Sequence, residues 1–137
     1  MTSPPAMVID ASIVASCLLP DEFQSTSLAD LGSSELHAPM LFWAETRNIL
    51  VVSERRRRLT VDTLSEALSI LDAIAVRLDE APDGSRVVQL ARSHQLTVYD
   101  ALYVELALRL QTPFWTLDRK LSAAAQREGV PTRWASA

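Results

Sequence analysis

The stretch AMVIDAS, residues 6–12, decides the fold of this chain. Its centre, Met7 to Ile9, is a compact apolar run rich in β-branched residues, which predicts a buried strand that Asp10 ends. The run IVASCLL that begins after Ser12 predicts a short helix. An acidic residue at the carboxyl end of a first strand stands where open α/β sheets bind ligands. Taken alone, Asp10 is explained equally well as a ligand-binding carboxylate or as an ordinary turn residue or helix N-cap.

The bulk composition describes one folded domain. The chain has 137 residues, of which 48% are hydrophobic and 22% charged, and we expect a single domain over residues 1–137. No apolar run approaches the length of a membrane span. Asp10 interrupts the stretch that a secretory signal would need, and the single cysteine, Cys17, excludes an intramolecular disulfide and a cysteine-rich zinc site. We therefore expect a cytoplasmic protein.

The charge balance restricts how the chain could bind a nucleic acid. Its formal net charge is −4, whereas proteins that bind nucleic acid through bulk charge are usually basic. Such a role must rest on a local basic patch or on metal ions that neutralise acidic groups. The candidate phosphate contacts are Arg55, Arg56, Arg57, Arg58, Arg119 and Lys120. The alternative is that these residues form a solvated helix end and a solvated first helical turn.

Strand and helix patterns alternate along the chain. We expect strands over residues 6–10, 35–38, 76–78 and 114–117, and an edge strand in the tail 130–137. We expect helices over residues 12–19, 21–31, 39–58, 60–75, 85–94, 96–111 and 118–128, with Pro39 in a first turn, Thr60 as an N-cap and Gly129 as a C-terminal stop. The alternation predicts a three-layer α/β/α sandwich with a mainly parallel central sheet.

Four carboxylates stand at related places in this pattern: Asp10, Glu45, Asp100 and Asp118. Asp10 and Asp118 directly follow predicted strands, and Glu45 lies among apolar neighbours in the long helix. Each also has an ordinary explanation: a helix N-cap for the two aspartates that follow strands, an exposed helix residue for Glu45, and a first-turn residue that complements the helix dipole for Asp100.

Asp100 is the most informative of the four. Glu105 and Arg109 are four residues apart in the same predicted helix, so they share a face, and we expect them to form a solvent-exposed pair. Asp100 lies about 140° away from Glu105 around the helix. A carboxylate on the apolar side of a helix is costly unless it is paired or bound to a metal.

The four carboxylates together favour a cation site. If the strands are parallel, Asp10 and Asp118 meet at one edge of the sheet, and Glu45 and Asp100 could face them from neighbouring helices. Several carboxylates packed together repel one another, so such a cluster needs a cation, and oxygen ligands select Mg²⁺ or Mn²⁺. These ions, bound to a phosphodiester, activate water and stabilise the leaving oxygen.

Four segments, VIDASI, PMLFWAETRNIL, YDALYVELA and TLDRKL, resemble in order those of a PIN-domain ribonuclease of the VapC toxin type. The resemblance covers nearly the whole chain. It implies a metal-dependent endoribonuclease with Asp10, Glu45, Asp100 and Asp118 as acidic positions, and products with a 5′-phosphate and a 3′-hydroxyl. Ser12 and Thr116 match the hydroxyl residues that often accompany the first and last aspartates. The resemblance also implies a homodimer, an RNA substrate and an antitoxin partner.

The remaining aromatic and histidine residues receive structural interpretations. We expect Trp43, Tyr99, Tyr103 and Trp115 in the core rather than stacked on bases. We expect His37 and His94 on the surface or in loops rather than as metal ligands.

Other functions fit the sequence less well. A haloacid-type phosphatase would need a second aspartate where Ser12 stands, and the acidic pair and late lysine of a receiver domain are not clear. Three glycines in all, with no G-x-G-x-x-G, P-loop or G-x-S-x-G motif, disfavour dinucleotide binding and α/β-hydrolase chemistry. A solitary RNA-processing nuclease and a non-catalytic interaction module of the same fold remain open.

Overall fold

The computed structural model describes residues 4–19 and 28–133, which contain five strands and seven helices. The strands are β1 (Ala6–Ile9), β2 (Glu35–Pro39), β3 (Val76–Asp79), β4 (Phe114–Trp115) and β5 (Thr132–Arg133). The helices are α1 (Ala11–Leu18), α2 (Leu28–Gly32), α3 (Leu41–Arg55), α4 (Val61–Ala73), α5 (Gly84–His94), α6 (Val98–Leu110) and α7 (Arg119–Arg127).

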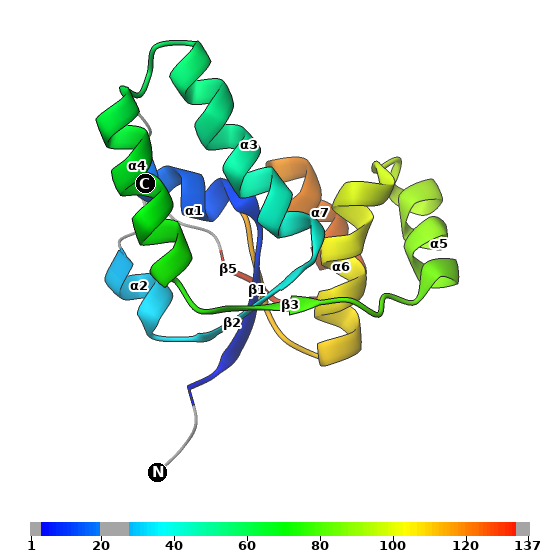
Figure 1. Cartoon of the computed structure of the whole chain (residues 1–137). Helices are drawn as coiled ribbons and strands as arrows, with labels where there is room; N and C mark the ends of the chain where they lie inside the picture. The colour runs from blue at the N-terminus through cyan, green and yellow to red at the C-terminus, as the bar shows by residue number, and fades with distance from the viewer. Residues whose placement is uncertain (1–3, 20–27, 134–137) are drawn as a thin grey trace.

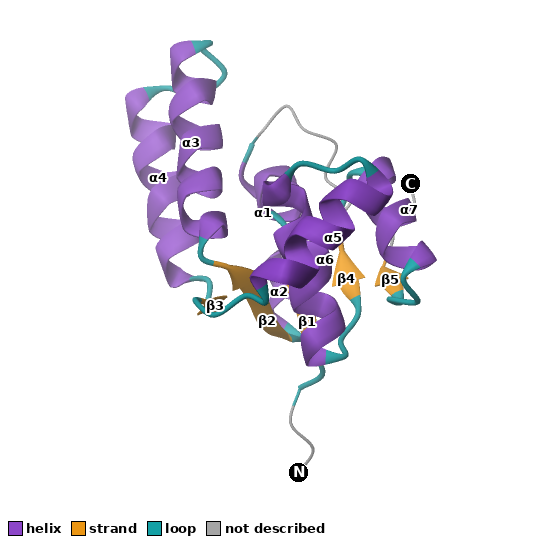
Figure 2. Ribbon diagram, turned by 90° about the vertical axis from the view of Figure 1, so that its right-hand side faces the viewer, coloured by secondary structure: helices purple, strands orange, loops and turns teal. Residues whose placement is uncertain are grey.

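The five strands form one parallel sheet in the order β3-β2-β1-β4-β5 (Figure 2). The chain winds from β1 outward through β2 to β3 and then returns to the other side of β1 for β4. The direction of winding therefore reverses between β1 and β4. Open α/β sheets bind ligands outside the carboxyl ends of the strands at such a reversal. Asp10 follows β1 and Asp118 follows β4 by three residues, so both carboxylates stand at this place.

Helices cover the sheet in two groups. In one group α6 packs on β1, β2 and β4, α7 packs on β4 and β5, and α5 packs on α6. In the other group α1 packs against α3 and α4, and α3 also contacts β2. Figure 1 shows the α3–α4 hairpin projecting away from the sheet. The core between the groups is fully enclosed at Val8, Ile9, Ala38 and Phe114, each 0% exposed. The predicted three-layer α/β/α sandwich is confirmed.

The long helix is shorter at both ends than the sequence predicts. Pro39 is the last residue of β2 and pairs with Asp79 of β3, so its predicted place in a first helical turn is wrong. The helix begins at Leu41 and ends at Arg55. The arginines that follow form a turn, in which Arg57 has a φ of 60°. Consecutive arginines thus mark the connection of the hairpin rather than a continuation of the helix.

Two other predicted boundaries also change. Only β4, residues 114–115, is strand within the predicted 114–117, because Thr116 leaves the ladder with its side chain bonded to Asp10. Of the predicted helix 21–31, residues 21–27 lie outside the described residues, and α2 begins at Leu28. Thr60 forms the predicted N-cap of α4, and Gly129 has the predicted positive φ, 83°, just after the end of α7.

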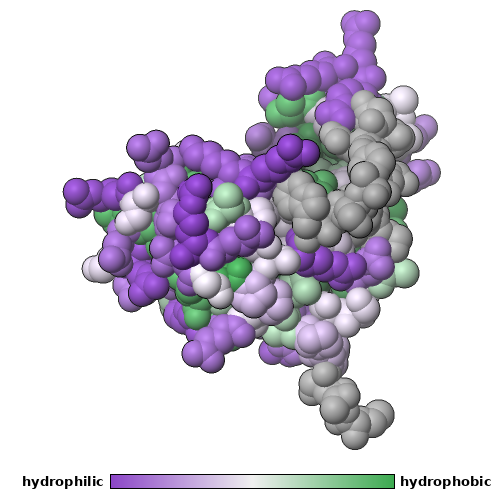
Figure 3. Space-filling model, turned by 180° about the vertical axis from the view of Figure 1, so that it is seen from behind, coloured by the Kyte–Doolittle hydropathy of each residue, from purple (hydrophilic) through white to green (hydrophobic). Residues whose placement is uncertain are grey.

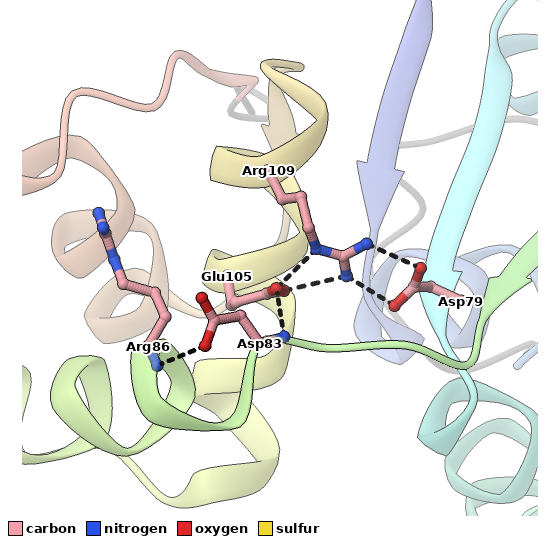
Figure 4. A network of polar contacts seen from close by, with 5 residues as sticks. All are labelled: Asp79, Asp83, Arg86, Glu105 and Arg109. Atoms are coloured by element: carbon pink, nitrogen blue, oxygen red, sulfur yellow. Dashed lines mark hydrogen bonds and ion pairs between the residues drawn. The ribbon is translucent and has the colours of Figure 1, made fainter.

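Glu105 and Arg109 form the predicted pair, but only Arg109 is exposed, whereas Glu105 is buried, and the pair is the centre of a larger polar network (Figure 4). Glu105 is 1% exposed and accepts hydrogen bonds from the Arg109 Nε at 2.7 Å and from the backbone N–H of Asp83 at 2.9 Å. Arg109 also donates to both carboxylate oxygens of Asp79, and this bonding lowers the pKa of Asp79. The network fastens α6 to the end of β3 and to the start of α5.

The two histidines are less exposed than the sequence predicts. His37 lies within β2 with Nε2 at 2.9 Å from the Glu35 carboxylate, and its side chain is 16% exposed. His94 ends α5 with Nε2 at 2.7 Å from the Glu128 carboxylate. Each ring is therefore paired with a single carboxylate in this structure.

One face of the molecule is mostly polar. Figure 3, a view from behind, shows a face covered largely by hydrophilic residues, with hydrophobic ones in small separate areas. Within residues 4–19 and 28–133, no helix is both long enough and apolar enough to cross a membrane.

Candidate active site

Asp10 is buried at the turn between β1 and α1, where it is 7% exposed. One carboxylate oxygen accepts hydrogen bonds from the Ser12 N–H at 3.1 Å and from the Ser12 hydroxyl at 2.5 Å. The other oxygen accepts from the Thr116 hydroxyl. Burial raises the pKa of Asp10 from 3.8 to about 6, although these hydrogen bonds lower it in part. Asp10 is therefore the N-cap of α1, as one interpretation of the sequence predicts. It is also a buried carboxylate whose charged form is disfavoured.

The hydroxyls of Ser12 and Thr116 join the two turns that follow β1 and β4. Ser12 Oγ accepts the N–H of Leu117 at 3.0 Å while it donates to Asp10. Thr116 Oγ1 accepts the N–H of Asp118 at 3.0 Å while it donates to Asp10. One carboxylate and two hydroxyls thus hold the ends of β1 and β4 together. Ser12 and Thr116 accompany the first and last aspartates in the sequence, and here both bond to Asp10.

Asp118 and Asp100 begin neighbouring helices. Asp118 is exposed and caps α7 by accepting the Leu121 N–H at 3.1 Å. Asp100 is half-buried in the first turn of α6, whose N-cap is Thr97. Burial, followed by the negative charge of Asp118, raises the pKa of Asp100. Asp118 therefore lies close enough to Asp100 to raise the pKa of Asp100, although both aspartates also have ordinary helix-terminal roles.

Glu45 and the phenol of Tyr103 complete the cluster. Glu45, half-buried in α3, accepts a hydrogen bond from Tyr103 Oη at 2.5 Å. Burial and then the charge of Asp100 raise the pKa of Glu45. The pKa of Tyr103 is raised by its own burial, by Glu45, and by the charges of Asp10 and Asp100. The phenol of Tyr103 is thus bonded to one predicted carboxylate and lies within the electrostatic reach of two others.

The chemistry of this donor set suits a hard divalent cation. Its members offer carboxylate and hydroxyl oxygens. Burial disfavours the charged form of Asp10, Glu45 and Asp100 and so raises their pKa values, and a bound cation would offset that cost. In the described part of the chain, no group of three or more His, Cys, Asp or Glu side chains stands in a geometry that could already hold a metal ion. The side chains therefore fit the ion in kind and in general position, and would have to close around it.

Replacing Asp10 by asparagine is expected to stabilise the metal-free protein near neutral pH. Folding raises the pKa of Asp10 to about 6, so the contribution of Asp10 to stability is most favourable below pH 4, where Asp10 is protonated in both the folded and the unfolded state. As the pH rises through about 6, the buried carboxyl ionises and this contribution to the free energy of unfolding falls, by about 3 kcal/mol at most for a shift of this size. Asparagine removes the charge and remains a good N-cap, so we expect a gain of about 1–2 kcal/mol at pH 7.5. Urea unfolding in EDTA at pH 7.5 and pH 4 measures this. A variant less stable than the parent at pH 7.5, by more than at pH 4, would contradict it.

The predicted basic residues occupy two different regions. Lys120 donates from Nζ to the Gln95 carbonyl at 2.9 Å, and its charge partly offsets the raised pKa of Asp100. Arg119 is exposed beside it. Arg55, at the end of α3, lies ten residues beyond Glu45, or about 15 Å along the helix axis. Arg119 and Lys120 therefore adjoin the carboxylates, whereas the run from Arg55 to Arg58 lies toward the far end of the hairpin.

The aromatic residues divide differently from the prediction. Tyr103 and Trp115 are buried, as expected. Trp43 is 53% exposed and Tyr99 is 61% exposed, so their predicted core positions are wrong. The Arg47 guanidinium stacks on the Trp43 side chain, 4.3 Å from its ring centroid. The link between Tyr103 and Glu45 was missed, although Tyr103 follows Asp100 by three residues and so shares its helix face.

A comparison with known families decides the classification. The PIN domain family model matches residues 7–127. The chain belongs to the PIN domain family. This PIN domain is 34% identical over 123 residues to Ribonuclease VapC1 of Mycobacterium tuberculosis, an alignment that covers 85% of this chain and 89% of the relative. It is 33% identical over 120 residues to Ribonuclease VapC3 of Pyrobaculum aerophilum, covering 85% and 92%. The resemblance inferred from the four sequence segments is confirmed.

Solved structures share the fold of this PIN domain at low sequence identity. The crystal structure of PAE2754 from Pyrobaculum aerophilum superimposes with a TM-score of 0.68 at 24% identity, over 93% of this chain and 90% of that one. FitAcB from Neisseria gonorrhoeae superimposes with a TM-score of 0.61 at 17% identity, over 92% and 95%. These similarities support the three-layer architecture and the parallel sheet.

Proposed function

We propose that this PIN domain is a Mg²⁺- or Mn²⁺-dependent endoribonuclease. The observation that carries the proposal is the hydrogen bond from Tyr103 to Glu45, together with the effect of the Asp10 and Asp100 charges on the same phenol, beside the point where the winding of the sheet reverses. Relatives that align over most of the chain are named ribonucleases. A cluster of partly buried carboxylates without a cation is costly, and phosphodiester hydrolysis is a reaction that such a metal site serves well.

Each residue of the site has a distinct task in this proposal. Asp10, Glu45 and Asp100 would hold the ion, and Asp118 would hold a second ion or orient the attacking water. The bound ion would supply a polarised water and charge stabilisation at the phosphate. Ser12 and Thr116 keep the Asp10 carboxylate in place through the hydrogen bonds described above. We also propose that Arg119, Lys120 and the run from Arg55 to Arg58 contact the RNA backbone, with the first two nearest the scissile bond.

We further infer that the protein is the toxin of a toxin–antitoxin pair. This rests on the VapC names of its relatives, and it brings with it an antitoxin partner, a homodimer and action in the cytoplasm. The second candidate is a solitary RNA-processing nuclease with the same site. Expression of the protein alone distinguishes them: a toxin arrests growth unless its antitoxin is co-expressed, whereas a solitary nuclease at the same level does not.

Cleavage of RNA by the purified protein is expected to require a divalent ion. We expect fragments to accumulate from a mixed cellular RNA substrate in about 5 mM MgCl₂ or MnCl₂, a concentration suited to a weakly held Mg²⁺ ion. We expect no fragments in EDTA. Restoring Mg²⁺ in excess over EDTA should restore cleavage. Equal cleavage in EDTA and in Mg²⁺ would remove the metal from the proposal, and an absence of cleavage under every condition would favour the non-catalytic interaction module.

A further inference from the structure

Tyr103 is a buried phenol whose hydrogen bond to Glu45 reaches across the fold. The residue is 2% exposed, and its ring stacks on Phe114 of β4, with ring centroids 6.0 Å apart and an interplanar angle of 24°. Its Oη lies 2.5 Å from Glu45 Oε1. Packing of the ring therefore fixes the phenol independently of Glu45, and the short hydrogen bond then fixes the carboxylate.

The bond joins the two groups of helices at the site. Glu45 comes from α3 and Tyr103 from α6, 58 residues apart in sequence. Tyr103 follows Asp100 by three residues, so the two side chains share one face of α6. A carboxylate held by Tyr103 is therefore held on the side of α6 that carries Asp100.

A neutral donor suits this place better than a cation would. The Glu45 carboxylate ends a side chain with three rotatable bonds. The negative charge of Asp100 repels it and so favours rotamers that turn the carboxylate away from the site. An arginine or lysine would hold it but would also neutralise the charge that a metal ion needs. A phenol is protonated and uncharged at neutral pH, so it can restrain one carboxylate oxygen while the other remains available.

We propose, on the basis of the nuclease function above, that Tyr103 is a positioning residue that orients the Glu45 carboxylate toward the cation held with Asp10 and Asp100. The phenol touches neither substrate nor the ion. It acts by orienting a metal ligand before the ion binds. In other metal sites, side chains that hydrogen-bond to the metal ligands have the same role, and their loss weakens metal affinity roughly 10- to 100-fold.

Tyr103→Phe tests the proposal because it removes the hydroxyl and keeps the stacked ring. We expect the metal-free variant to bind Mn²⁺ about tenfold more weakly than the parent in isothermal titration calorimetry. We also expect the Mg²⁺ concentration for half-maximal RNA cleavage to rise by a similar factor, with a rate close to the parent's at saturating Mg²⁺. Tyr99→Phe removes an exposed phenol from the same helix and should leave both quantities unchanged.

A double-mutant comparison separates positioning from a structural role. In a Glu45→Ala background, Tyr103→Phe should cause no further loss of Mn²⁺ affinity, because the carboxylate that it orients is gone. Mn²⁺ affinity within twofold of the parent in Tyr103→Phe, or the same loss with and without Glu45, overturns the proposal while leaving the nuclease function intact. A parent protein that neither binds Mn²⁺ nor cleaves RNA overturns both.

Discussion

Asp100→Asn is expected to reduce metal-dependent RNA cleavage by about a hundredfold or more, without unfolding the protein. Asparagine keeps the size of the side chain but removes the negative charge that a divalent cation requires. Asp100 is half-buried, and its pKa is raised by burial and by Asp118. Its negative charge therefore destabilises the folded state, and removing it should not unfold the protein. Initial rates with a labelled RNA in saturating Mg²⁺, together with circular dichroism and urea unfolding, measure both parts of this expectation.

Asp62→Asn is the matched control for that substitution. Asp62 is also an aspartate in the first turn of a helix capped by a threonine, but it is exposed at the start of α4, in the other group of helices. Its replacement should leave the rate within about twofold. If Asp100→Asn cleaves as fast as the parent, or if Asp62→Asn loses as much activity, then the carboxylate cluster is not the catalytic centre.

Arg109→Ala is expected to cause the largest loss of stability among surface-accessible charges. It would leave Glu105 buried with only the Asp83 N–H as a partner, and Asp79 without either of its guanidinium bonds. Removal of one member of a buried pair costs about 3–5 kcal/mol, and because the Arg109 side chain is 34% exposed we expect about 2–3 kcal/mol. Urea unfolding at pH 7 measures the free energy of unfolding.

Two further variants interpret that loss. Arg77→Ala removes an arginine whose side chain is 72% exposed and lies 3.7 Å from the Glu35 carboxylate, and should cost below about 1 kcal/mol. Adding Glu105→Gln to Arg109→Ala should recover part of the loss, because the amide oxygen can still accept the Asp83 N–H without a buried charge. Equal losses in Arg109→Ala and Arg77→Ala would show that the network of Figure 4 does not anchor α6.

Local patterns sufficed to predict most elements of the fold. The apolar run before Asp10, the threonine cap at Thr60 and the glycine at Gly129 each depend on contacts within a few residues, and the structure has them as predicted. The spacing of Glu105 and Arg109 misled because an i, i+4 pair looks the same on an exposed or a buried face. Glu105 is buried, and Arg109 also bonds Asp79, thirty residues away, which no local pattern contains.

Part of the candidate site could also be predicted from the sequence. Parallel strands place their carboxyl ends at one edge, so residues that follow strands, such as Asp10 and Asp118, can be grouped without coordinates. The partner of Glu45 could not be found in this way, because Tyr103 reads as an ordinary core aromatic until α3 and α6 are placed. Exposure of Trp43 was likewise hidden, since an apolar helix stretch does not show which side faces solvent.

Anomalous X-ray scattering from crystals grown with Mn²⁺ tests the central claim most directly, because it locates the ion without assuming its ligands. The account predicts a Mn²⁺ peak bound by Asp10, Glu45 and Asp100, outside the carboxyl ends of β1 and β4. A protein that cleaves RNA in Mn²⁺ but shows no peak there, or binds the ion at a different set of side chains, would contradict it.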